Sequence, residues 1–316
     1  MRIVFLGTPE AAVVSLEALL AADDVDVPAV ITNPDRARGR SGRPSAPPVK
    51  LAAQSAGVPV WQPARPREVV DDLRALQVDA CAVVAYGALL PGEVLAAGGR
   101  GFVNLHFSLL PRWRGAAPVQ HAIRAGDTVT GVTTFVLDEG MDTGPVLASD
   151  EVTIGPRETA GELLDRLAHR GAPLLVDSLR ALVGGAEPTP QPEEGATLAP
   201  KVTPDDVAID LSMSAEVVDR LVRSANPAPG AHTRFRDRRL KVFAAVPVDG
   251  DGPAGSVLRS EPAGVVVSCG QGAVRLEEVQ PEGSARMSGA AFVNGHRPEA
   301  GERLGGQPQG EARSGG

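Results

Sequence analysis

The chain has 316 residues, about twice the length of a common domain, so two domains are expected. Hydrophobic residues make up 43% and charged residues 22%, which is typical of a globular protein and excludes a disordered chain. No apolar run reaches the roughly 18 residues of a membrane span, and the apolar N-terminus is too short for a signal peptide. We therefore expect a cytoplasmic protein without membrane contact. Two distant cysteines and five histidines without paired spacing predict no disulfide framework and no metal site.

The formal net charge of −8 argues against general coating of nucleic acid, but basic residues concentrate in two segments. Residues 34–50 hold five basic side chains and one acidic one, and residues 223–241 hold six and one. Such segments are typical of local docking sites for a polyanion. The alternative is that arginine is simply abundant, because lysine occurs only at positions 50, 201 and 241.

In the first part of the chain, short apolar runs alternate with amphipathic stretches. This alternation predicts βα units and a mostly parallel sheet. The predicted strands are 2–7, 25–32, 79–85, 101–106, 131–137 and 146–154. The predicted helices are 9–22, 49–56, 66–76, 118–124 and 160–183. Thr8 is expected to cap the first helix with its hydroxyl.

The composition changes at Gly184, where a stretch rich in Gly, Pro, Glu and Thr begins. One amphipathic helix (215–224) follows, and then short strands at 231–235, 239–247, 255–260, 264–268 and 273–279, a spacing that favours a small β-barrel. The sequence thus predicts a Rossmann-like α/β domain (1–183), a linker (184–206), an OB-like β-barrel domain (207–304) and a disordered tail (305–316).

Three polar residues could form a catalytic group. Asn104 and His106 are two residues apart in a predicted strand, so both face the same way near its carboxyl end, where α/β sheets bind ligands. Asp142 lies on a glycine-bounded turn after the next strand, and we expect it at the same edge. An amide, an imidazole and a carboxylate could together serve acyl transfer. The alternative is a buried structural histidine beside two turn residues.

A longer motif surrounds these residues. Residues 104–118 read Asn-Leu-His-Phe-Ser-Leu-Leu-Pro-Arg-Trp-Arg-Gly-Ala-Ala-Pro, and Asp142-Thr143-Gly144 follows downstream. This pattern resembles the signature of the folate-dependent formyltransferases. The resemblance extends from the first strand to about Leu304 and includes shorter segments at 5–9, 33–36, 83–87 and 226–227.

The resemblance implies a formyl donor and an acceptor. The donor would be 10-formyltetrahydrofolate, without a metal. The Arg-Trp-Arg-Gly-Ala-Ala-Pro continuation implies that the acceptor is the α-amino group of methionine on initiator tRNA. Asn104 would stabilise the oxyanion, while His106 and Asp142 would move the proton, and which of the two is the base stays open.

The resemblance also implies two sets of binding residues. The folate pocket would include Tyr86, Gly87, Ser108, Leu109, Leu110 and Pro111. The tRNA would be contacted by an arginine loop and by the predicted barrel, through Arg36, Arg38, Arg40, Arg43, Arg234, Arg236, Arg238, Arg239 and Lys241.

Two positions depart from the family pattern. Phe107 follows the motif histidine where many relatives have glycine, and we expect only a packing change from it. Ala228 lies between prolines where relatives often carry an aromatic residue. A formyltransferase acting on a sugar-nucleotide amine and a catalytically inactive RNA-binding module remain alternatives. A monomer is expected.

Overall fold

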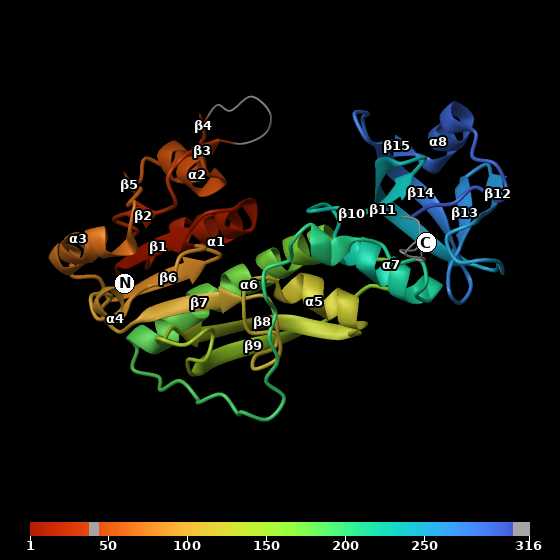
Figure 1. Ribbon diagram of the computed structural model, residues 1–316. Coiled ribbons are helices and arrows are strands. Elements are labelled where there is room, and N and C mark those ends of the chain that lie inside the picture. Colours follow the sequence, from red (N-terminus) through yellow and green to blue (C-terminus); the bar gives the residue numbers. More distant parts are fainter. Residues whose placement is uncertain (38–43, 306–316) are drawn as a thin grey trace, which may run out of the picture. The chain divides into compact units, whose positions relative to one another are not determined.

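The computed structural model describes residues 1–37 and 44–305 (Figure 1). Their contacts form two compact units. The first comprises Met1–Val119, Thr128–Ile154 and Glu162–Lys201, and the second comprises Gln120–Asp127, Gly155–Gly161 and the chain from Val202 onward. Within the described ranges, no helix is both long and apolar enough to cross a lipid bilayer.

The first unit is built on a seven-stranded sheet in the order β5-β2-β1-β6-β7-β8-β9. The strands are β1 (Ile3–Gly7), β2 (Val30–Ile31), β5 (Val60–Trp61), β6 (Ala80–Val84), β7 (Phe102–His106), β8 (Val129–Val136) and β9 (Val146–Thr153). Every pairing from β5 to β7 is parallel, whereas β8 and β9 pair antiparallel. The prediction of an α/β domain with a mostly parallel sheet is confirmed.

Helices and a small hairpin complete this part of the chain. The helices are α1 (Glu10–Leu20), α2 (Pro48–Ser55), the 3₁₀ helix η1 (Pro66–Val69), α3 (Val70–Leu76), α4 (Gly92–Leu95), α5 (Pro118–Ala125) and α6 (Ala160–Val183). Strands β3 (Arg36–Ala37) and β4 (Pro44–Ser45) pair antiparallel. All residues of β1 and β6 are buried, as the uninterrupted apolar runs of central parallel strands require.

Thr8 does not cap α1, so that prediction is wrong. The N-cap position is Pro9, and it carries no side-chain capping bond. The Thr8 hydroxyl instead donates to the Tyr86 carbonyl at 3.0 Å, because the loop after β6 lies against the end of β1. Thr8 therefore helps to fix the Tyr86 loop.

The second unit contains a mainly antiparallel sheet in the order β10-β11-β14-β13-β12, with β15 paired to β14. Its elements are η2 (Asp205–Val207), α7 (Ala215–Ser224), β10 (Ala231–Phe235), β11 (Arg238–Val248), β12 (Val257–Glu261), β13 (Gly264–Ser268), β14 (Ala273–Pro281), β15 (Met287–Ser288) and α8 (Gly289–His296). Leu304 bridges β10 at Phe235, and Arg303 bridges Ser256 just before β12, so one segment links both edges. The predicted barrel-like β domain is confirmed.

A buried carboxylate ties α7 to the segment Gly155–Gly161 of its unit. Asp219 is only 6% exposed. It accepts from Arg157 Nη1 at 2.7 Å and from Arg223 Nε at 2.8 Å. Arg157 also donates to the carbonyl of Ala245 in β11 at 2.7 Å, so this group joins three segments of the unit.

Replacing Asp219 with alanine should destabilise the second unit by about 3 kcal/mol, because it leaves the nearly buried Arg223 guanidinium without its counter-ion. Urea unfolding followed by circular dichroism measures this change. Asp177→Ala is the matched control, since Asp177 forms an exposed ion pair with Arg180 and should change the midpoint little. Equal midpoints for the two variants would contradict the prediction.

Candidate active site

The buried imidazole of His106 lies at the end of β7 and is 5% exposed. Its Nε2 lies 2.8 Å from the carbonyl oxygen of Trp113. A carbonyl can only accept a hydrogen bond, so this contact assigns the proton of the neutral ring to Nε2. Nδ1 therefore carries the lone pair.

Nδ1 lies 3.7 Å from Oδ2 of Asp142. Burial lowers the pKa of His106 below its usual value, and the Asp142 carboxylate and the Trp113 carbonyl offset this only in part. The imidazole is thus neutral near pH 7, with a basic nitrogen next to a carboxylate that would stabilise the protonated ring.

Asp142 reaches this position by a route that the sequence did not indicate. We expected Asp142 at the same edge as His106, and its carboxylate does lie beside the imidazole. The assumed strand direction is wrong, because β8 runs antiparallel to β7 and the turn therefore starts at the opposite end of β7. The turn leaves the sheet beside Phe102, where Leu137 donates to the Phe102 carbonyl, four residues before His106. A strand rises about 3.3 Å per residue, so the turn must extend roughly 13 Å back along β7 for Asp142 to reach His106.

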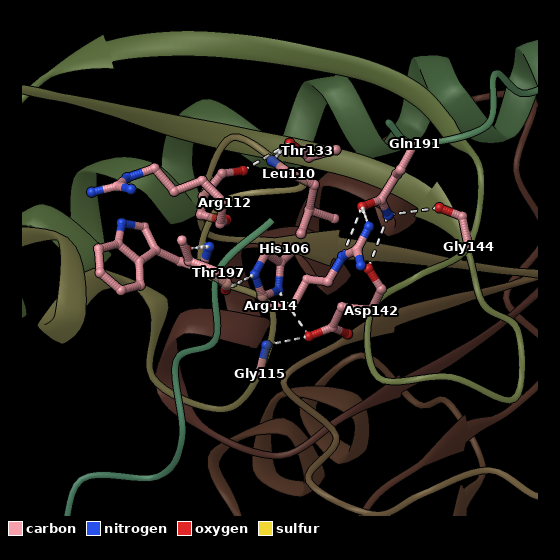
Figure 2. A network of polar contacts seen from close by, with 12 residues as sticks. His106, Leu110, Arg112, Arg114, Gly115, Thr133, Asp142, Gly144, Gln191 and Thr197 are labelled. Atoms are coloured by element: carbon pink, nitrogen blue, oxygen red, sulfur yellow. Dashed lines mark hydrogen bonds and ion pairs between the residues drawn. The ribbon is translucent and has the colours of Figure 1, made fainter. Parts of the chain in front are cut away.

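The turn is held in place by the loop after β7. Asp142 itself has a left-handed backbone with φ of 54°, which few residues other than glycine adopt. The backbone N–H of Gly115 donates to Asp142 Oδ2 at 2.7 Å (Figure 2). The same oxygen, Oδ2, therefore has one fixed donor and also faces the imidazole.

Asn104 belongs to the same strand and faces the same way as His106. Its side chain is half-buried and hydrogen-bonds to none of the described residues. The amide N–H groups are thus free to donate to a ligand. An unengaged amide on the same face as a neutral imidazole is the arrangement that stabilisation of an oxyanion requires.

The loop predicted to bind folate is rigid and mostly apolar. Ser108 is fully buried, and its hydroxyl donates to the Arg112 carbonyl at 2.6 Å. The Thr133 hydroxyl donates to the Ser108 carbonyl at 2.7 Å and lies 3.1 Å from the N–H of Leu110. The serine therefore shapes the loop, whereas Leu109, Leu110 and Pro111 are only partly buried.

Tyr86 and Gly87 lie in a second loop, which is held by hydrogen bonds from residues that follow β1 and β2. The Tyr86 side chain is 4% exposed, and burial raises the pKa of its phenol. Its carbonyl accepts from Asn33 Nδ2 at 2.6 Å as well as from Thr8. Gly87 has φ of 79°, a conformation suited to glycine. Phe107 is buried, 7% exposed, directly after the strand.

The residues predicted to bind tRNA fall into two groups. Arg36 is exposed in β3, whereas Arg38, Arg40 and Arg43 lie outside the described residues. In the second unit, Arg234 lies opposite Arg239 across the β10–β11 pair, and His232 lies opposite Lys241.

Most members of the second group have protein partners, and Arg234 Nη2 donates to the Asp237 carbonyl at 2.7 Å. Arg236 forms an ion pair with Glu302 at 2.8 Å, and Arg238 donates to the Glu282 carbonyl at 3.0 Å. Lys241 donates to the Pro229 carbonyl at 2.9 Å. Arg239 makes no side-chain hydrogen bond or ion pair to the described residues. A hollow of about 380 Å³ lies at Arg234, Arg239 and His232.

Two residues beside the site were missed by sequence reasoning. Gln191 and Thr197 lie in the segment predicted as a linker, and both hydrogen-bond to the loops around His106 (Figure 2). A polar residue in a Pro- and Glu-rich stretch gives no periodic signal, so nothing in the pattern marked them. Among the described residues, no group of three or more His, Cys, Asp or Glu side chains could hold a metal ion.

Comparison with known proteins assigns the chain to a family. A model of the formyl transferase family matches residues 1–179, and a model of its C-terminal domain matches residues 201–297. The chain belongs to the formyl transferase family, as the motif predicted.

Individual relatives agree with this assignment. The chain is 50% identical to the methionyl-tRNA formyltransferase of Streptomyces griseus, covering 96% of this chain and 100% of that protein. It is 48% identical to the protein of the same name from Streptomyces coelicolor, with the same coverage. The crystal structure of HypX from Aquifex aeolicus in complex with tetrahydrofolic acid has the same fold, with a TM-score of 0.65 and 19% identity. The match covers 99% of this chain, and this chain spans about half the length of HypX.

NMR titration of the His106 ring should give a pKa below about 6.5. Asp142→Asn should lower that pKa further, because the neutral amide no longer stabilises the imidazolium. The exposed Asp165→Asn variant should leave the His106 titration unchanged. A raised pKa in Asp142→Asn would contradict the geometry.

The lowered pKa of His106 also predicts a dependence of stability on pH. As the pH falls below about 6.5, the His106 ring of the unfolded chain binds a proton before that of the folded chain does, so the free energy of unfolding should fall.

Proposed function

We propose that this protein transfers the formyl group of 10-formyltetrahydrofolate to the α-amino group of methionine on initiator tRNA. The observation that carries the proposal is the free Asn104 amide beside a neutral His106 whose Nδ1 faces Asp142. Near-full-length similarity to proteins named methionyl-tRNA formyltransferase supports this acceptor over a sugar-nucleotide amine. It also disfavours the alternative of an inactive RNA-binding module.

The residues suit each step of the reaction. The neutral amine attacks the formyl carbon, and the carbonyl oxygen becomes an oxyanion to which the Asn104 amide donates. His106 accepts the amine proton at Nδ1, and the Asp142 carboxylate stabilises the resulting imidazolium. The oxyanion then re-forms the carbonyl, the bond from the formyl carbon to N10 of the folate breaks, and N10 takes up the proton from the His106 imidazolium, which returns the ring to its neutral form. The products are tetrahydrofolate and the formylated aminoacyl-tRNA.

The folate is proposed to lie between the two loops that flank the site. Leu109, Leu110 and Pro111 would give an apolar wall for the pterin, and the Tyr86–Gly87 loop would form another. Ser108 would support this wall without contacting the pterin, because its hydroxyl is buried and donates within the loop. The crystal structure of HypX with tetrahydrofolic acid supports folate binding by this fold.

The tRNA is proposed to be bound by the two basic segments. On the exposed face of the β10–β11 pair, Arg234 lies directly opposite Arg239, and like charges in this arrangement repel. A phosphate between them would remove that cost, which favours a polyanion as the ligand. Arg36 and the following arginines Arg38, Arg40 and Arg43 are proposed to contact the end of the tRNA that carries the methionine. We propose that the protein works in the cytoplasm, as a monomer.

Incubation with 10-formyltetrahydrofolate and either charged initiator tRNA, free methionine or water tests the reaction. Only the charged tRNA should be formylated. Asn104→Ala should lower kcat by about 10²–10³-fold, because it removes the oxyanion donor. Its KM for tRNA should stay unchanged, because the amide touches only the reacting carbonyl. Efficient transfer to free methionine or to a sugar-nucleotide amine would contradict the proposed acceptor.

The salt dependence of tRNA binding tests the basic face. In the Arg234→Ala/Arg239→Ala double variant, the slope of log K against log salt concentration should fall by about 1–2, because fewer counterions are released. Arg180→Ala is the matched control, since Arg180 is engaged by Asp24 and Asp177. Filter binding at several salt concentrations gives the slopes. An unchanged slope in the double variant would remove this face from the interface.

A further inference from the structure

We propose that residues 189–199, which we call the strap, belong to the catalytic centre, with Gln191 and Thr197 as positioning residues for the two groups that flank the His106 imidazole. The inference rests on the proposed function for its catalytic consequence. The strap lies in the stretch expected to be a linker, but it forms part of the first compact unit. Thr189 exchanges two backbone hydrogen bonds with Val146, at 2.7 and 2.8 Å, which fixes its beginning at β9.

Gln191 holds the turn of Asp142. Its Nε2 donates to the carbonyls of Asp142 at 2.9 Å and Gly144 at 2.7 Å. Its Oε1 accepts from Arg114 Nε at 3.1 Å and Nη2 at 2.8 Å. All four hydrogen-bonding positions of the amide are used, and Figure 2 shows this side chain between Arg114 and Gly144.

The partners of Gln191 leave only one orientation of its amide. Two carbonyl oxygens require the NH₂ group, and a guanidinium requires the oxygen. A glutamate in this place could keep the contact with Arg114 but could not donate to the turn. The position therefore needs both ends of a glutamine.

Thr197 acts on the other side of the imidazole. Its hydroxyl accepts from the N–H of Trp113 at 2.9 Å, and its carbonyl accepts from the N–H of Arg114 at 2.8 Å. Trp113 supplies the carbonyl that accepts from His106. Its backbone has φ of 64°, an unfavourable conformation for so large a residue.

Trp113 and Asp142, the two residues that contact the imidazole nitrogens, both have left-handed backbones, and each is held by one strap side chain. Such conformations persist only where surrounding contacts over-determine them. The turn of Asp142 also has to reach back along the sheet, and the two donations from Gln191 to its backbone add to the Gly115 N–H that holds its carboxylate.

The strap approaches the loop closely. Ala199 donates to the Arg114 carbonyl at 2.7 Å and accepts from Ala117 at 3.1 Å. A Cβ on Gly115 would lie 2.6 Å from the Ala199 carbonyl oxygen, so only glycine fits there. Gly115 is also the donor to Asp142, and the strap therefore fixes this donor as well.

Gln191→Glu is the sharpest test, because it keeps the side-chain length and the partner Arg114 but loses both donations. In steady-state formylation of charged initiator tRNA, kcat should fall about 10–100-fold, since small misplacements of reacting groups cost rates of this size. KM for tRNA should change by less than about threefold. The control Glu187→Ala alters an exposed residue that precedes the strap and should leave both constants unchanged. Wild-type turnover in Gln191→Glu would overturn the proposal.

Thr197 offers an independent pair of variants. Thr197→Ser keeps the hydroxyl and should retain at least about half of the wild-type kcat, whereas Thr197→Val should lose about tenfold at a similar thermal midpoint. Equal kcat values for the serine and valine variants would overturn the role of the hydroxyl.

A measurement without the reaction separates this inference from the proposed function. The amide proton of Gly115 donates to a carboxylate, and its NMR shift should move upfield in Gln191→Glu but not in the control Glu187→Ala. A loss of kcat with an unmoved Gly115 signal would overturn positioning, because Gln191 would then act on the substrate directly. An inactive wild-type protein would instead refute the proposed function, while the Gly115 shift would still report on the strap.

Discussion

The site depends on one buried imidazole whose two nitrogens have different neighbours. The Trp113 carbonyl fixes the proton at Nε2, and the remaining lone pair at Nδ1 faces a carboxylate. Burial keeps this ring neutral, which a base must be before it can accept a proton. The sheet supplies only the ring and the Asn104 amide. Both neighbours of the ring, Trp113 and Asp142, lie in loops and have left-handed backbone conformations, so the chemistry depends on what restrains those loops.

Much of the fold could be predicted because burial imposes periodicity on the sequence. The apolar run of β1, the amphipathic pattern of α7 and the strands β10 and β13 all end close to where the pattern indicated. The direction of β8 could not be predicted in this way, because a buried strand has a similar apolar pattern whether its neighbour is parallel or antiparallel. Helix α8 was missed because it begins at a glycine, contains another and shows little amphipathic contrast.

The catalytic residues show the same division. A period of two places Asn104 and His106 on one face, and the structure keeps them there. Asp142 meets His106, although for a different reason from the one expected, since its turn folds back from the far end of the strand. Gln191 and Thr197 leave no trace in the periodicity of the sequence, because they act through individual long-range hydrogen bonds and not through burial of one face of a helix or strand.

The strap also changes where the catalytic unit ends. A boundary placed at the end of α6 would remove every hydrogen bond that Gln191, Thr197 and Ala199 make to the loops around His106. The compact unit instead continues to Lys201, one residue before the second unit resumes at Val202. Polar and backbone contacts give this stretch a fixed path without helix or strand, which is why its composition resembles a linker. The last passage of the chain from the first unit to the second therefore comes directly after the residues that position the catalytic loops.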